Sequence, residues 1–429
     1  MVLAGEYEVE LSNIGYFSDS GLLEVRYKGQ DVASLELDFL HNGLPRKRMT
    51  AKWEKPVLHE PELPDGVDFN ELLLKLMGSH NICSRETVIR QYDHEVKGKT
   101  VIKPLMGPRG VAPQDAAVMR FGFDDYCGVA VSNGIIPRYS DIDAYHMSSG
   151  AFDEALRQII AVGGQLPDLE SETSTFWSVN DNFCVPDSFY DPVTNPDGKY
   201  KLAQLIRMCE ALYDMSTFFN VPMTSGKDSM KNDFKQDGVK ISVPPTILYS
   251  MTAYVDDVRR TVTSEFKAED DLIYQLGETY DELGASEVYR VLKETGAKVP
   301  IVRRQRALEL YRRVMEANKR GLIESCHDLS DGGLAVALAE SAFGGGFGVQ
   351  VDLASIHEGL MGQSDDPVRR KLLLLFSESH SRFIVSIAPG NQDEFEQLMG
   401  ERAFFLGKTN KEDSIELRLG NETLLDLET

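Results

Sequence analysis

Residues 327–334 read HDLSDGGL and run directly into the apolar segment AVALAE, and this stretch decides how the fold is interpreted. Two carboxylates, a hydroxyl and a glycine pair stand at the entry of a predicted helix. Ser330 or Asp331 is placed to cap that helix, and Gly332 and Gly333 leave its first backbone amides open to an anion. Carboxylates beside an anion site make chemical sense if a divalent cation lies between them and phosphate oxygens. The alternative is an ordinary N-cap followed by a surface helix.

A second segment of similar character lies upstream, where residues 222–233 read PMTSGKDSMKND after a predicted helix over 202–219. A glycine between a hydroxyl and a lysine is typical of a loop that approaches phosphate closely. Lys227 and Asp228 are therefore candidate phosphate-side residues, although the spacing is not that of a Walker A loop. A polar turn with a solvated Lys227 is the alternative. Together the two segments predict a phosphorylated or nucleotide ligand held without a P-loop.

The composition excludes several classes of partner. With 429 residues, 42% hydrophobic and 26% charged, the chain is expected to form two globular domains. A net charge of −23 argues against a nucleic acid or an anionic membrane surface as partner. An anionic ligand then requires a site with its own cations, either Lys and Arg or a metal. No apolar run approaches the roughly 18 residues of a membrane span, and no basic signal-peptide region is recognisable.

Cysteine usage predicts reduced thiols and a cytoplasmic location. The five cysteines are odd in number and scattered, without the C-x-x-C pairs of a zinc site or the pattern of a disulfide framework. Each is expected to be a small residue in or near the core. They are Cys83, Cys127, Cys184, Cys209 and Cys326.

Both ends of the chain predict a β-hairpin. Residues 21–37 alternate apolar and polar side chains around a Lys-Gly-Gln turn, and residues 415–427 repeat that pattern around a Gly-Asn turn. A lone hairpin does not hold itself together in water. Residues 1–40 are therefore predicted to be the last hairpin of a domain whose body lies elsewhere. A hairpin packed on the folded body is the alternative.

Between the hairpins the patterns alternate between helix and strand after a connector rich in proline and charge at 43–68. The first region is predicted to hold strands at 100–103, 116–122, 128–132 and 246–255, helices at 68–77, 148–162 and 200–219, and a polar loop over 171–200. From about residue 256 a second region is predicted to hold helices at 284–295, 299–319 and 332–345, and strands at 272–275, 348–351 and 381–388. Helices that cover strands favour α/β and α+β layers rather than a helical bundle.

The first region also contains acidic residues that suit a metal. Glu154 and Gln158 are four residues apart in a predicted helix, so both project from one face. Asp115 precedes an apolar strand. A carboxylate and an amide that face an aspartate supply the hard oxygen ligands that Mg²⁺ prefers. The alternative is a solvated Glu154 and a Gln158 that only aids solubility.

At these motifs the chain resembles the synthetase subunit of phosphoribosylformylglycinamidine synthase, also called formylglycinamide ribonucleotide amidotransferase. The matching segments follow the family's order and span nearly everything from residue 70 to 429. They read NICSRE at 81–86, RQYDHEV at 90–96, DEALR at 153–157, DNFC at 181–184, SGKDS at 225–229 and HDLSDGG at 327–333.

The resemblance implies an aminoimidazole ribonucleotide synthetase-like unit with an N-terminal α/β half and a C-terminal α+β half. Members of the family carry two such units in tandem. The implied domains are a tail hairpin of a preceding unit at 1–42, a linker at 43–68, an N-terminal domain at 69–257 and a C-terminal domain at 258–429.

The family reaction is an ATP-dependent ligation in purine biosynthesis that converts the formylglycinamide amide into an amidine with ammonia from glutamine. ATP and ADP with Mg²⁺ are the implied ligands. By correspondence of motifs, the metal ligands are Asp115, Glu154, Gln158 and Asp328. The phosphate contacts are Arg85 and Ser330, with Lys227 and Asp228 as further candidates. Arg85 stands where the family usually has lysine, and Gln158 where it usually has asparagine.

The same resemblance implies that catalytic residues lie mainly in a first unit absent here, so none is assigned and the chain alone is expected to be inactive. The implied partners are that unit and a glutaminase subunit or domain. One alternative is a stand-alone homodimeric synthetase of the same superfamily. Another is a catalytically silent scaffold that a bound nucleotide stabilises.

Overall fold

The N-terminal residues 1–50 form a unit of their own in the computed structural model, which describes residues 2–64, 66–167, 176–360 and 363–428. The unit contains α1 (Val2–Glu6), β1 (Leu22–Tyr27), β2 (Gln30–Glu36) and α2 (Leu37–Asn42). The predicted hairpin is present, and almost all its side chains are exposed. Its strands shift register between Val25 and Arg26, as the C-terminal hairpin does between Leu417 and Arg418. The two hairpins therefore share a bulge as well as a sequence pattern.

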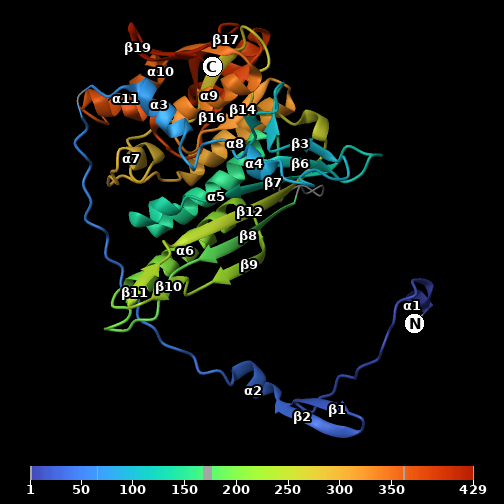
Figure 1. The fold of residues 1–429 in the computed structure, drawn as a ribbon. Helices are drawn as coiled ribbons and strands as arrows, with labels where there is room; N and C mark the ends of the chain where they lie inside the picture. The colour runs from blue at the N-terminus through green and yellow to red at the C-terminus, as the bar shows by residue number, and fades with distance from the viewer. Residues whose placement is uncertain (1, 65, 168–175, 361–362, 429) are drawn as a thin grey trace. The chain divides into compact units, whose positions relative to one another are not determined.

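The second unit, residues 51–429, is built around two large sheets (Figure 1). The first sheet has six strands in the order β3-β6-β7-β12-β8-β9, and all neighbours are antiparallel except β8 and β9. The strands are β3 (Thr100–Ile102), β6 (Ala117–Arg120), β7 (Gly128–Gly134), β8 (Trp177–Cys184), β9 (Met223–Ser229) and β12 (Thr246–Val255). Alternate residues of β12 are fully buried, as expected for a strand with one face on a core.

Two helices cover this sheet on one side. α5 (Ala144–Ala161) packs against β7 and β12, and α6 (Gly198–Phe219) packs against α5. α5 is almost wholly buried because the second sheet and its helices lie on its other side, including β14 and α8. α5 therefore carries side chains from the first sheet toward the second, which is where the candidate site forms.

Two strands correct the sequence-based prediction. The polar segment 171–200 is predicted as a loop, but residues 177–184 form the interior strand β8, while 171–175 lie outside the described residues. The predicted phosphate loop at 222–233 mostly forms β9, on the edge of the same sheet. In β8 only alternate residues such as Trp177, Val179 and Phe183 are apolar and buried, so intervening polar residues hide the strand in the sequence.

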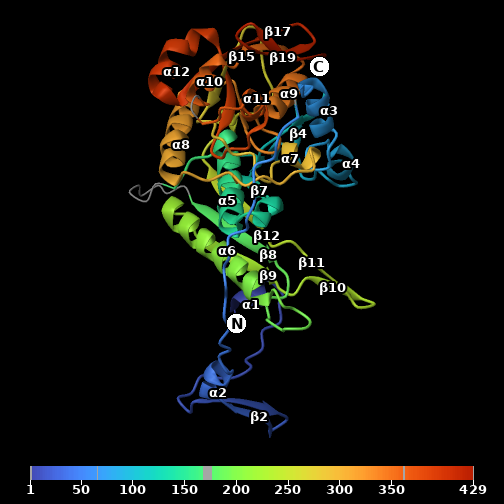
Figure 2. The same ribbon diagram turned by 90° about the vertical axis from the view of Figure 1, so that its left-hand side faces the viewer.

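The second sheet has seven strands in the order β14-β16-β13-β17-β15-β18-β19, with β15 and β18 parallel. The strands are β13 (Leu272–Leu276), β14 (Ser325–Asp328), β15 (Gly348–Asp352), β16 (Phe383–Ile387), β17 (Ala403–Asn410), β18 (Ser414–Leu419) and β19 (Glu422–Glu428). The helices around it are α7 (Glu287–Val291), α8 (Arg304–Lys319), α9 (Gly333–Gly345), α10 (Ala354–Leu360), α11 (Pro367–Phe376) and α12 (Gln392–Met399). Figure 2 shows α8, α12 and α9 grouped around this sheet. The mixture of helices and sheets confirms the predicted α/β class.

Short elements complete the unit. They are α3 (Phe69–Met77), α4 (Glu86–Ile89), β4 (Leu105–Met106), β5 (Ala112–Pro113), β10 (Asp233–Gln236), β11 (Val239–Ser242) and the 3₁₀ turns Pro137–Asp141, Val258–Arg260, Pro389–Asn391 and Gly400–Arg402. No helix among the described residues is long and apolar enough to cross a membrane.

The core continues from one sheet to the other. One cluster of buried side chains includes Val118 and Met251 from the first sheet together with Tyr274 and Phe383 from the second. The expected boundary at 257/258 lies between the last strand of the first sheet and the chain that leads to the second. Because apolar packing is shared across it, the two halves hold a site between them rigidly.

The expected connector is partly fixed to the body. Trp53 stacks on Tyr200 with ring centroids 5.4 Å apart, and Arg207 lies 4.5 Å above the Trp53 ring. Further along, the Glu60 carboxylate accepts from Arg369 at 2.7 Å. Residues 51–64 are thus a strap that Trp53 and Glu60 fix to the rest of the second unit.

Candidate functional site

The last residues of β14 bring two acidic groups together. All four residues of this strand are buried, and the Asp328 amide donates to Asp115 Oδ2 at 3.0 Å. The other oxygen, Asp115 Oδ1, lies 2.6 Å from His327 Nδ1. Ligand atoms of Asp115, His327 and Asp328 lie within 4.8 Å of one another, the one group of this kind in the described part of the chain. Residues from the two halves of the unit therefore converge at the end of β14.

His327 lies between two carboxylates. Its Nε2 is 3.0 Å from Glu340 Oε2 on α9, opposite the contact with Asp115. Burial alone would lower the pKa of His327, but attraction and hydrogen bonding from Asp115 and Glu340 raise that pKa well above its ordinary value. Each ring nitrogen of His327 thus faces a carboxylate, and in this arrangement His327 positions Asp115.

Arg157 on α5 ties the same acidic group to the helix. Its Nε donates to Asp328 Oδ2 at 2.8 Å and its Nη2 to Ser330 Oγ at 2.6 Å. A third bond, from Nη1 to Asp153 Oδ2 at 3.0 Å, joins residues one turn apart on α5. The Arg157 side chain is 2% exposed, so this is a buried, charge-assisted network. It orients Asp328 and Ser330 relative to α5.

Glu154 is the next acidic group on α5. Its Oε2 accepts from the Ile135 amide at 2.9 Å. Burial raises the pKa of Glu154 to about 7, with further contributions from the nearby Asp328 and Asp153 carboxylates. Burial likewise raises the pKa of Asp115 to about 6, although the nearby His327 lowers that pKa. Both carboxylates are desolvated and Asp328 repels each of them, an arrangement that a cation would relieve.

Gln158 lies one turn beyond Glu154, as the sequence predicts. Its amide is best oriented with the nitrogen donating to the backbone carbonyls of Asp115 at 3.0 Å and Asn133 at 2.8 Å. The amide therefore fixes the backbone next to Asp115 and turns its oxygen away from these carbonyls. Its role as a metal ligand stays a prediction.

The glycine pair at the start of α9 allows close packing of the backbone and contacts a buried carboxyl group. Gly332 is the N-cap, with φ of 79°, and its amide donates to Glu378 Oε1 at 2.9 Å. A Cβ on Gly333 would overlap the Ser377 carbonyl. Neither Ser330 nor Asp331 caps this helix. The carboxyl group of Glu378, which no sequence motif predicted, is thus the acceptor at this helix terminus.

A cavity of about 240 Å³ lies beside these groups. Its lining includes the acidic Asp331 and Glu378 and the basic Arg85 and Arg138. The exposed Arg85, a predicted phosphate contact, is therefore at the edge of this cavity, while Ser330 bonds directly to Asp328 Oδ2 at 2.6 Å. The cavity is large enough for part of a ligand that reaches toward the carboxylates.

Lys227 and Asp228 are not brought to this group. Both lie on the exposed edge strand β9, which β8 and β12 separate from β7. Burial raises the pKa of the Asp181 carboxyl on β8, and the nearby Asp228 raises it further. The structure thus gathers six of the eight predicted residues around the end of β14 and the adjoining cavity, and leaves these two apart.

Sequence reasoning missed the residues that hold the site together. Arg157 lies in the DEALR segment and Glu340 ends the apolar run AVALAE, but neither was predicted to act in the site. Both are charged residues in otherwise apolar helices, and a charged residue in a buried helix needs a partner, so this pattern could have pointed to them.

The domain match and the fold agree on a class of protein. Residues 268–420 match the family model described as AIR synthase related protein, C-terminal domain. A solved structure of Thermotoga maritima PurL complexed with ATP superposes with a TM-score of 0.57 at 16% identity, covering 84% of this chain and 51% of that one. T. maritima PurL complexed with FGAR gives a TM-score of 0.56 at 17% identity, with 73% and 46% covered. The chain thus has an AIR synthase-like fold, as predicted.

Curated relatives identify the particular protein it resembles. The chain is 30% identical to the phosphoribosylformylglycinamidine synthase subunit PurL of Methanocaldococcus jannaschii over 99% of its length and 53% of that protein. It is 31% identical to the PurL subunit of Thermococcus gammatolerans over 98% of its length and 52% of that protein. The chain is therefore homologous to PurL, which confirms the predicted resemblance. It spans about half the length of the curated relatives it matches.

Proposed function

We propose that this chain is the C-terminal portion of the synthetase component of an ATP-dependent, amidine-forming ligase of purine biosynthesis. The reaction is conversion of formylglycinamide ribonucleotide to its amidine with ammonia derived from glutamine. The homology to PurL subunits over nearly the whole chain supports this function. The chain matches about half of each relative, and residues 22–36 form a hairpin like the one at its other end. Both observations support a chain that holds one synthetase unit preceded by the last hairpin of another.

One observation carries a ligand-binding role for this portion. Asp115, on the chain before β6, meets Asp328 at the end of β14, and Glu154 on α5 is near enough to Asp328 for that carboxylate to raise its pKa. We propose that they hold Mg²⁺, with Gln158 as a further oxygen donor. The fit rests on the donor set, which is oxygen-rich, desolvated and self-repelling. Such a cation, when bound, neutralises charge on phosphate oxygens.

The protein's own residues complete the proposed nucleotide site. Ser330, held by Arg157, presents a hydroxyl beside Asp328, and Arg85 lies on the adjoining cavity as a cationic phosphate contact. His327 and Arg157 keep two carboxylates fixed before any ligand arrives, which lowers the cost of ordering the site. The ligand proposed for this site is ATP or ADP with Mg²⁺.

The proposed partners follow from the same relationship. A solved structure described as PurLQS from T. maritima contains a related chain, at 18% identity, in an assembly. We expect this chain to work with a first synthetase unit and a glutaminase component, and to be inactive alone. Turnover of formylglycinamide ribonucleotide with ammonia by the isolated chain would contradict that expectation.

Thermal unfolding of the purified chain tests the nucleotide site. ADP with Mg²⁺ is expected to raise the melting temperature, since a ligand that binds only the folded state stabilises it by mass action. Asp328→Asn and Glu154→Gln should abolish this rise, each measured against its own ligand-free melting temperature. Asp413→Asn and Glu358→Gln change exposed residues and should retain it. No rise in the wild-type chain at millimolar nucleotide would refute the site and leave the homology standing.

A further inference from the structure

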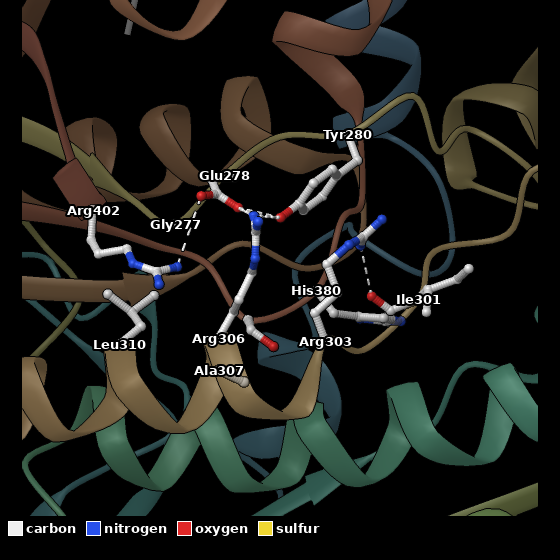
Figure 3. A pocket seen from close by; sticks show the side chains of 11 residues that line it. Gly277, Glu278, Tyr280, Ile301, Arg303, Arg306, Ala307, Leu310, His380 and Arg402 are labelled. Carbon is white, nitrogen blue, oxygen red and sulfur yellow. Dashed lines mark hydrogen bonds and ion pairs between the residues drawn. The ribbon is translucent and has the colours of Figure 1, made fainter. Parts of the chain in front are cut away.

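A small cavity lies along the first turns of α8 (Figure 3). Its lining residues do not include Asp115, Glu154 or Asp328. Its walls come from the chain after β13, the first turns of α8, the segment before β16 and the turn before β17. The cavity measures about 20 Å³, room for a water or a small anionic head group but not for a nucleoside.

Three guanidinium groups face this cavity. Arg306 pairs with Glu278 and lies 2.8 Å from the Tyr280 hydroxyl. Arg402 is 3.8 Å from the same Glu278 carboxylate, and Arg303 stacks 3.4 Å from the centre of the Tyr280 ring. Figure 3 shows the three arginines spread around the opening with Glu278 between two of them. The lining therefore carries three positive charges against one negative charge.

Two further carboxylates hold the arginines in place from outside the lining. Glu282 accepts from Arg303 at 2.8 Å, and Glu309 accepts from Arg402 at 2.7 Å. These pairs fix two guanidinium groups without filling the cavity. Since each guanidinium has five N–H donors, donors remain for another acceptor.

The end of α8 adds a second source of positive potential. The helix is 16 residues long and begins at Arg304, and among the described residues no side chain caps it. The first amides of a helix have no partner within the helix, and the helix dipole favours an anion there. The cavity runs along one side of the first turns of α8, from Arg303 to Leu310, so an anion beside Arg303 would lie near this end of the helix.

His380 is the independent sign of a ligand. Its side chain is 7% exposed, and within the described chain neither ring nitrogen has a hydrogen-bond partner. Its ring borders the cavity beneath Arg303 (Figure 3). Burial, together with the positive charge of Arg157 and other groups nearby, lowers the pKa of His380 well below its usual value. The neutral ring keeps one N–H donor, and a buried donor without a partner is rare in folded proteins.

We propose that this cavity binds a small oxyanion of the phosphate class. The ligand is held by Arg303, Arg306 and Arg402 and by the Nδ1–H of His380, whose Nε2 lies against Gly150 on α5. Either free inorganic phosphate or the phosphoryl group of a small phosphomonoester has this chemistry. The site is additional to the proposed nucleotide site and does not depend on it.

Phosphate titration of the purified chain tests the proposal. Inorganic phosphate should raise the melting temperature saturably, whereas sodium chloride at equal ionic strength should not. Arg306→Gln should weaken phosphate binding about tenfold, the loss expected for one charge-assisted contact. Arg312→Gln is the matched control, because Arg312 is an exposed arginine on the same helix. His380→Phe should weaken binding to a similar extent, and if that buried variant fails to fold, Arg402→Gln replaces it.

Two further measurements distinguish free phosphate from a phosphomonoester, and this cavity from the proposed nucleotide site. Tighter binding of ribose 5-phosphate than of inorganic phosphate would identify a phosphomonoester, and the reverse order would identify the free anion. Asp328→Asn should leave phosphate binding unchanged even though it removes the proposed nucleotide site. The proposal is overturned if neither ligand binds, or if Arg306→Gln and Arg312→Gln weaken binding equally.

Discussion

Replacing Arg157 with methionine tests the network that holds the candidate site. The substitution keeps much of the buried volume but removes the hydrogen bonds to Asp328, Asp153 and Ser330, between 2.6 and 3.0 Å long. Asp328 is 5% exposed and Asp153 is fully buried. Breaking a buried ion pair from one side leaves an uncompensated charge, which costs about 3–5 kcal/mol. We expect a loss of that size in the free energy of unfolding.

Urea unfolding followed by circular dichroism measures this loss. Arg320→Met is the control, because Arg320 forms two ion pairs but its side chain is 44% exposed, and exposed pairs contribute about 0–1 kcal/mol. The double variant Arg157→Met with Asp328→Asn should lose less than the sum of the single variants, since both remove the same contact. A loss below about 1 kcal/mol for Arg157→Met, or strict additivity, would refute the reasoning.

The same variant links the network to the proposed metal. With Arg157 removed, Asp328 and Ser330 are no longer held in place before a ligand binds. Millimolar Mg²⁺ should therefore raise the melting temperature of Arg157→Met less than that of the wild type. An equal rise in both would show that Arg157 does not organise the proposed metal site.

Three other outcomes are expected. Burial raises the pKa of Asp271 to about 6, so the folded state binds this proton more tightly than the unfolded state does. The free energy of unfolding therefore falls as pH rises from about 4 to 6, and Asp271→Asn should remove roughly 1 kcal/mol of that decrease when unfolding is measured against pH. Trp53→Ala removes the stack on Tyr200 and should cost about 1–2 kcal/mol and speed proteolysis near residue 53, and an unchanged cleavage rate would show that the strap is not held there. Gly333→Ala places a side chain at φ of 65° against a carbonyl and should cost about 1–3 kcal/mol of unfolding free energy, whereas Gly359→Ala, in open space, should not destabilise the protein.

Local patterns determined much of the secondary structure. The hairpins at both ends, the helices at 144–161 and 198–219 and the strand at 246–255 were predicted close to their observed bounds. Each has a regular apolar period or a turn signal that acts over a few residues. β8 was not predicted because its polar residues break the apolar pattern, and pairing with β12 and β9 stabilises it as a strand.

For the candidate site, the sequence supplied the chemistry and the tertiary structure supplied the neighbours. The acidic residues at 115, 154 and 328 could be named from motifs, but a sequence does not state which residues 171 or 213 positions apart will touch. Only the packing of α5 against β14 placed Arg157 on Asp328, and only the approach of Asp115 and α9 to β14 placed His327 between Asp115 and Glu340. Strand pairing left Lys227 on the edge strand β9. Side-chain type follows from local sequence, whereas charge pairing depends on burial and on long-range contacts that exist only after the two sheets assemble.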